Sequence, residues 1–162
     1  MNGRKDLALL VPAGGKFVEL GVAAGKYAVE VLTVNPSMQY IGIDRWNDHH
    51  DEIEMLNAQE KLLPFDSASL MRITFKDALP LFDNESIDLI YLDGYAHTGQ
   101  ERGETISDWW GKVKSGGIMA GHDYCKEYQP TIDAVNAFVD QENLNLHIID
   151  DNPYASWMVK KP

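Results

Sequence analysis

The arrangement of apolar and polar positions along the chain predicts short strands that alternate with helices. Residues 17–20, 40–43 and 87–92 form compact apolar runs, which are typical of strands buried in a parallel sheet. Residues 71–75 and 144–148 instead alternate at period two, as half-covered strands do. Two further strands are predicted over 118–120 and 155–159.

Helical spacing of apolar residues separates most of these strands. The predicted helices span 26–33, 51–63, 106–113 and 132–139. The third has the clearest apolar stripe, at i, i+3, i+4 and i+7, and Trp109 and Trp110 belong to it. These two tryptophans are therefore expected in the core. In the second helix, Ile53, Leu56 and Leu63 are expected to form the buried side.

The order of these elements predicts the fold class. Strands separated by helices indicate an α/β fold with a mostly parallel sheet and helices on both faces. The turn residues 150–153 lie between the last two strands and predict a C-terminal antiparallel hairpin. With 162 residues and no linker or repeat, the chain is expected to be a single domain over residues 1–162.

Net charge and cysteine content indicate which binding partners and which cellular location to expect. The chain has 14 Lys and Arg against 25 Asp and Glu, a formal net charge of −11, which argues against nucleic acid or an anionic membrane as a partner. Cys125 is the only cysteine, so there is no internal disulfide. No apolar run reaches membrane-spanning length, and residues 1–6 contain no apolar signal core. A cytoplasmic protein is expected.

The turn after the first predicted strand carries the first chemical signal. Gly21 and Gly25 flank a small residue, Ala23, and allow a ligand to approach the backbone, while the following helix offers free N–H groups. Asp44 ends the second predicted strand, where a carboxylate can accept hydrogen bonds from a ribose diol. Together they predict a nucleoside-binding site.

The spacing of this turn discriminates among nucleotide ligands. It is one residue too short for a Walker loop, and Tyr27 follows Lys26 where Ser or Thr is needed. It also lacks the G-x-G-x-x-G pattern that binds a dinucleotide pyrophosphate. A nicotinamide-dependent oxidoreductase and a non-catalytic nucleoside-binding or scaffold domain stay open as alternatives.

A family resemblance enters at this point. The segments that carry it are Val18–Gly25, Ile43–Asp44, Lys76–Ala78, Ile90–Gly94 and Val113–Ile118. In this order they resemble a class I S-adenosylmethionine-dependent methyltransferase. Leu92–Gly94 followed by Ala120–Tyr124 is similar to bacterial O-methyltransferases that act on sugar or antibiotic hydroxyls. The resemblance implies a seven-stranded Rossmann-like sheet and methyl transfer from S-adenosylmethionine to an oxygen of a small molecule.

The resemblance also implies donor-binding residues. The methionine end of the donor would be held by Glu19 and by the backbone of Gly21, Val22, Ala23 and Gly25. The ribose hydroxyls would be bound by Asp44, and the adenine would lie near Arg45, Trp46, Asp77 and Ala78.

Transfer to a hydroxyl requires a place for the hydroxyl proton. Asp93 ends one predicted strand, and His122 and Asp123 end its neighbour, so the three side chains are expected to converge. Two carboxylates and an imidazole suit Mg²⁺ or, because of the imidazole, Mn²⁺. Asp93 alternatively binds the donor's amino group or caps a turn. His97 is the candidate base without a metal, since its ordinary pKa of about 6.5 suits proton removal.

The acceptor side is less defined. Only 16 residues precede the first predicted strand, so the acceptor cleft is expected to be open or completed by a second subunit in a homodimer. The run 48–52 is rich in His and acidic residues and is expected to form a polar loop that begins the next helix.

Overall fold

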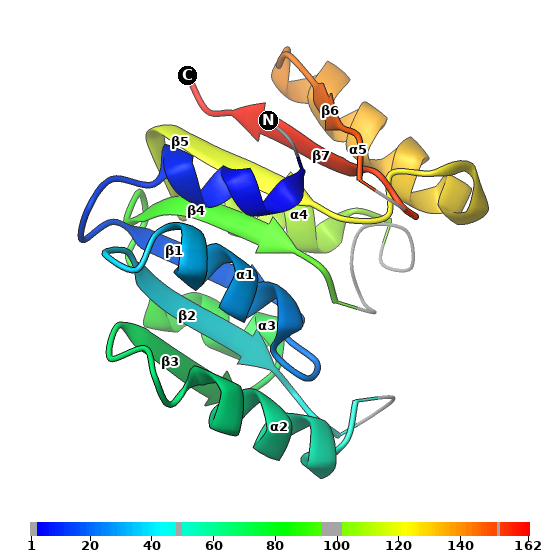
Figure 1. Cartoon of the computed structure of the whole chain (residues 1–162). Helices are drawn as coiled ribbons and strands as arrows, with labels where there is room; N and C mark the ends of the chain where they lie inside the picture. The colour runs from blue at the N-terminus through cyan, green and yellow to red at the C-terminus, as the bar shows by residue number, and fades with distance from the viewer. Residues whose placement is uncertain (1–2, 48–49, 95–101, 152) are drawn as a thin grey trace.

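The structure is a computed structural model that describes residues 3–47, 50–94, 102–151 and 153–162. A twisted seven-stranded sheet lies between two layers of helices (Figure 1). Its strands are β1 Lys16–Leu20, β2 Gln39–Asp44, β3 Ala68–Arg72, β4 Ile87–Leu92, β5 Val113–Gly121, β6 His147–Ile149 and β7 Ser156–Lys160. The predicted α/β class is confirmed.

The strand order places the switch point of the sheet at β1. The order is β3-β2-β1-β4-β5-β7-β6, and β1 pairs in parallel with β2 on one side and β4 on the other. Strand β7 runs antiparallel to both β5 and β6, so the predicted C-terminal hairpin is confirmed. In an open parallel sheet, ligands bind beyond the carboxyl ends of the strands where the order reverses, which here is between β1 and β4.

Helices cover both faces of this sheet. One face is covered by α1 Lys26–Val34, α2 Glu52–Leu62 and the 3-10 helix η1 Arg4–Leu10 (Figure 1). The other is covered by α3 Phe75–Ala78, α4 Glu104–Trp110 and α5 Gln129–Glu142, with short 3-10 turns η2 Leu79–Leu81 and η3 Lys126–Tyr128. In the described residues the structure contains no helix with the length and apolarity that a membrane crossing requires.

The two cores follow from alternation along the buried strands. Phe17 packs on the α1 side with Tyr27, whereas Val18 and Leu20 pack on the α4 side. Trp109 is buried in the second core, as predicted, and its ring packs edge-on against Phe82. The core therefore fixes β1 and β4 from both faces and holds their carboxyl ends in place.

The prediction for the buried side of α2 was wrong. Ile53, Leu56 and Leu63 are 67%, 55% and 78% exposed, and the helix instead buries Ala58 and Leu62. A Cβ added to Gly25 would lie 3.0 Å from the Cα of Ala58, so the helix packs closely through its small residue. Close packing of α2 against Gly25, in the turn after β1, determines which side of the helix faces inward. The size of the apolar side chains does not.

The sequence analysis did not predict the short helices α3 and η1. The predicted strand over 71–75 is β3, which ends three residues earlier because Thr74 caps α3: its Oγ1 accepts from Asp77 N at 3.1 Å and donates to Asp77 Oδ2 at 2.7 Å. The segment before β1 forms η1, whose Leu7 and Ala8 are completely buried. The N-terminal residues thus pack on the sheet's helical layer.

Gly21 marks a close approach of two strand ends. Its φ is +99°, and a Cβ there would lie 2.4 Å from both the N and Cα of Gly94. The sequence prediction assigned this glycine to the approach of a ligand. The structure gives an internal reason: the backbones after β1 and β4 are in direct contact.

We expect Gly21→Ala to be much more destabilising than Gly14→Ala. Gly14 has a φ of +73° with no atom within 4 Å of an added Cβ, so its replacement costs about 1 kcal/mol from the backbone conformation alone. Gly21→Ala must also push the two backbones apart, which adds about 2–3 kcal/mol. Urea unfolding of both variants measures the difference, and equal losses would contradict the close contact.

Candidate functional site

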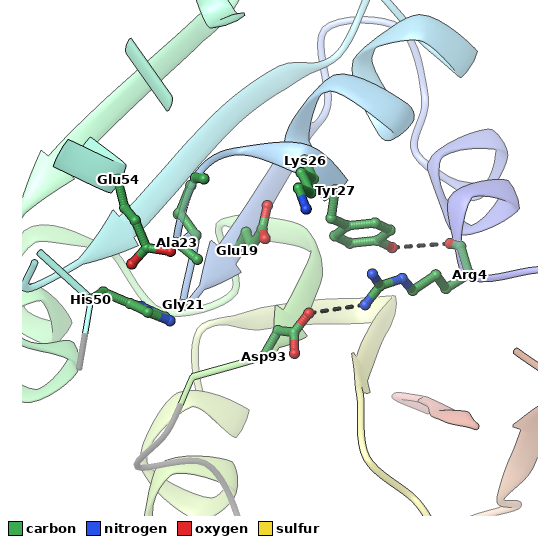
Figure 2. Close-up of a pocket in the computed structure, with 11 residues that line it drawn as sticks. Arg4, Glu19, Gly21, Ala23, Lys26, Tyr27, His50, Glu54 and Asp93 are labelled. Carbon is green, nitrogen blue, oxygen red and sulfur yellow. Dashed lines mark hydrogen bonds and ion pairs between the residues drawn. The ribbon is translucent and has the colours of Figure 1, made fainter. Parts of the chain in front are cut away.

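A cleft of about 270 Å³ lies at the switch point, above the ends of β1 and β4 and beside the start of α1 (Figure 2). It is lined by Arg4, Glu19, Gly21, Val22, Ala23, Ala24, Lys26, Tyr27, His50, Glu54 and Asp93. Arg4 and Asp93 lie toward one end and His50 and Glu54 toward the other, with the turn after β1 between them. The cleft is lined by groups of both charges.

Glu19 provides a buried carboxyl group at the bottom of this cleft. It is 1% exposed, on β1, and its Oε2 accepts a hydrogen bond from the hydroxyl of Tyr40. Burial raises the pKa of Glu19 well above its usual range, although the hydrogen bond from Tyr40 acts in the opposite direction. A cation placed in the cleft would favour the ionised form of this group.

Asp44 supports the turn that forms the middle of the cleft. Its Oδ2 accepts from the backbone amides of Val22 at 2.9 Å and Ala23 at 3.0 Å, and its Oδ1 accepts from Trp46 N at 3.0 Å. Asp44 is 4% exposed, and it lies behind the turn instead of lining the cleft. Asp44 therefore orders the turn amides in this structure.

His50 is a site residue that the sequence analysis missed. Its Nδ1 lies 2.9 Å from Asp44 Oδ2, and its ring lines the cleft. The next residue, Asp51, caps α2 by accepting from Glu54 N at 3.0 Å. The expected helix start is therefore present, whereas residues 48 and 49 of the expected loop lie outside the described residues. The contact of His50 with Asp44 could not be predicted from local spacing.

The structure separates the residues expected at the donor into two groups. Glu19, Gly21, Val22, Ala23 and Asp93 line the cleft, whereas Gly25, Asp44, Arg45, Trp46, Asp77 and Ala78 are not among its described lining residues. Trp46 is buried, and its Nε1 donates to Ala23 O at 2.9 Å, which braces the turn from behind. The side chain of Asp77 is bound to Thr74 at the start of α3.

Three side chains converge at the ends of β4 and β5, as the sequence predicts. His122 Nδ1 lies 3.3 Å from Asp93 Oδ1 and 3.0 Å from Asp123 Oδ1. One ligand atom from each of the three residues lies within 4.8 Å of the others. Asp93 belongs to this cluster and to the cleft, so the two are continuous.

The charge of His122 follows from these neighbours. Burial by itself lowers the pKa of His122. The hydrogen bonds to Asp123 and Asp93 have a larger effect in the opposite direction and raise the pKa to about 9. At neutral pH the imidazole is therefore protonated between two carboxylates. A metal ion and this proton compete for the same three side chains.

Arg4 is a second residue that the sequence analysis missed. Its Nη1 lies 3.0 Å from Asp93 Oδ2, so η1 contributes a cation to the cleft. The expected base His97 lies outside the described residues, and its role stays a prediction.

Comparisons with known proteins agree with this architecture. A family model described as a methyltransferase domain matches residues 18–124. Among curated proteins, no sequence relative is found.

Solved structures share the fold at low sequence identity. A proposed methyltransferase from Streptococcus mutans in complex with SAH has a TM-score of 0.73 and 15% identity, covering 98% of this chain and 95% of its own. A proposed rRNA methylase from Clostridium thermocellum has a TM-score of 0.72 and 14% identity, covering 96% and 93%. A SAM-dependent O-methyltransferase from Thermotoga maritima has a TM-score of 0.69 and 14% identity, covering 96% of this chain and 62% of its own.

We expect Asp44→Asn to lower the free energy of unfolding by about 2 kcal/mol, because an amide offers one acceptor oxygen in place of two and directs N–H groups at backbone donors. The exposed Asp83→Asn removes the same charge elsewhere and should have little effect. Chemical denaturation of the two variants measures this. A loss at position 44 no larger than at position 83 would contradict the supporting role of Asp44.

The raised pKa of His122 predicts a pH-dependent contribution to stability in the metal-free protein. This contribution is complete below pH 6.5, the ordinary pKa, and is lost as the pH rises through about 9. NMR titration of the imidazole should therefore show a midpoint near pH 9. Replacement His122→Asn should remove that part of the decline in unfolding free energy, and a midpoint near 6.5 would refute the pairing.

Proposed function

This chain belongs to the methyltransferase domain family, and from this premise we propose that it transfers a methyl group from S-adenosylmethionine to a hydroxyl oxygen of a small molecule. The fold is that of the class I S-adenosylmethionine-dependent methyltransferases. The observation that carries the proposal is the position of Asp93, which lines the cleft and also belongs to the cluster with His122 and Asp123. The methyl donor in the cleft and the acceptor hydroxyl at the cluster would both lie beside this residue.

The cleft supports an extended orientation for the donor. Its amino acid end would lie toward Glu19 and Asp93, whose carboxyl groups suit an ammonium. Its ribose would lie toward Asp44, where a diol would take the place of the His50 contact. Arg45, Trp46, Asp77 and Ala78 are proposed for the adenine, which extends beyond the turn.

The reaction is an in-line displacement at the donor's methyl carbon. The acceptor oxygen forms a bond to this carbon, the carbon–sulfur bond breaks, and S-adenosylhomocysteine leaves with the bonding electron pair. The hydroxyl proton must depart as well. The protein therefore contributes mainly by positioning the two substrates and by accepting or redirecting this proton.

The donor set of the cluster fits a divalent ion. Asp93, His122 and Asp123 would hold it, and their mixture of two carboxylates and an imidazole favours Mn²⁺ over Mg²⁺. When bound, such an ion lowers the pKa of a hydroxyl next to it. His97 is the proposed base in the absence of a metal.

A small acceptor agrees with the overall charge. With a net charge of −11, the chain repels the phosphates of RNA, although an rRNA methylase shares the fold. We therefore propose a small molecule as acceptor, reached through an open cleft or one completed by a second copy of the chain.

Binding measurements test this proposal without knowledge of the acceptor. Titration calorimetry should show saturable binding of S-adenosylhomocysteine and none of NAD⁺, since the turn lacks the pyrophosphate glycines. Electron paramagnetic resonance should show that the wild-type protein binds Mn²⁺ and that Asp123→Ala lowers the affinity for Mn²⁺ at least about tenfold.

The exposed Asp140→Ala on α5 is the charge-matched control and should retain Mn²⁺ binding. Absence of S-adenosylhomocysteine binding to the wild-type protein would refute the donor assignment. Equal Mn²⁺ affinity in the two variants would refute the metal assignment alone, and leave the donor assignment in place.

A further inference from the structure

Arg4 belongs to the N-terminal 3-10 helix η1, and its guanidinium lines the cleft at the edge of the sheet. Its guanidinium carbon lies 4.6 Å from the centroid of the Tyr27 ring (Figure 2). Its Nη1 is 3.0 Å from Asp93 Oδ2 and 3.4 Å from the hydroxyl oxygen of Tyr91. Arg4 therefore lies at the end of the cleft that contains the carboxylate of Asp93.

The backbone of Arg4 is held as firmly as its side chain. Its amide donates to Asp151 Oδ2 at 3.1 Å, and its carbonyl accepts from the hydroxyl of Tyr27 at 3.0 Å. The Nε atom lies 3.6 Å from the same Asp151 oxygen. The fold thus aims the guanidinium into the cleft before any ligand arrives, and such preorganisation lowers the entropy lost on binding.

The Arg4–Asp93 pair has the charge pattern that complements an α-amino acid. Such a molecule carries an ammonium and a carboxylate on one carbon, and each would find its opposite charge in this pair. The two side chains retain 23% and 21% exposure, so both can be reached from the cleft. A ligand that brings both charges replaces one internal ion pair by two, and leaves neither side chain buried without a partner.

We propose that Arg4 binds the α-carboxylate of the methyl donor, exchanging its contact with Asp93 for a two-pronged contact with the donor while Asp93 accepts from the donor's ammonium. The proposal rests on the proposed function, because it requires the donor in this cleft. It also fits the arrangement of the lining residues, since His50 and Glu54 lie at the opposite end of the cleft from Arg4, where the nucleoside would extend.

Arg4 suits this role better than the other cation of the cleft. Lys26 also lines it, at the start of α1, but its side chain is exposed to solvent. A guanidinium is planar and presents paired N–H groups whose spacing matches the two oxygens of a carboxylate, whereas an ammonium acts as a point charge. The position of the Arg4 guanidinium over the Tyr27 ring adds a cation–π contact that holds the group at the cleft.

A pair of ligands isolates the contact. S-adenosylhomocysteine contains the amino acid end, and 5′-methylthioadenosine lacks it but keeps the nucleoside and the sulfur. We expect Arg4→Gln to weaken binding of S-adenosylhomocysteine about 10- to 100-fold, as measured by calorimetry, and to change binding of 5′-methylthioadenosine less than about twofold. Lys5→Gln removes the same charge from an exposed position of η1 and should leave both affinities unchanged.

Each other outcome overturns the inference in a recognisable way. Unchanged binding of S-adenosylhomocysteine in Arg4→Gln would show that Arg4 does not touch the carboxylate. Equal weakening of both ligands would show that Arg4 only shapes the cleft. If the wild-type protein binds neither ligand, the proposed function fails together with the inference.

A measurement on the wild-type protein covers the case in which Arg4→Gln does not fold. Decarboxylated S-adenosylhomocysteine should bind the unaltered protein about 10- to 100-fold more weakly than the complete compound. Equal affinity for the two compounds would overturn the assignment of Arg4. Arg4→Lys should recover part of the discrimination, because it keeps the charge without the fork.

Discussion

The contact between the backbones of Gly21 and Gly94 determines the geometry of the site. These residues follow β1 and β4, and neither strand end has space for a side chain between them. Because the two backbones touch, Glu19 on one strand and Asp93 after the other open onto one cleft. A bulkier residue here would displace the turn amides, which Asp44 holds from behind, so the contact determines the binding surface as well as the packing.

Opposite charges are then paired within a small volume. Arg4 is shared between Asp93 and Asp151, and His122 between Asp93 and Asp123. Asp93 is the common member of both groups, with one oxygen toward each cation. In a chain with an excess of acidic residues, such pairing keeps partly buried carboxylates from repelling one another. A ligand that binds Asp93 therefore meets a carboxylate with an internal cation beside each of its oxygens.

The sequence predicted features that depend on local pattern or on strand ends. The run Ile87–Leu92 matches β4, and the convergence of Asp93 with His122 follows from the adjacency of β4 and β5. Features that depend on distant contacts were not predictable. Nothing near Arg4 signals its approach to Asp93, and the burial of α2 through Ala58 is visible only once Gly25 lies beneath it.

The attachment of η1 has a consequence for the order of assembly during folding. Arg4 meets Asp93 across 89 positions of sequence and Asp151 across 147, so these contacts join the start of the chain to parts synthesised much later. Closing loops of this length has a high entropic cost unless the intervening sheet is already in place. A folding intermediate with a complete sheet and a detached η1 would therefore have a cleft that lacks Arg4. The ability to bind a ligand there would appear only after most of the native hydrogen bonds have formed.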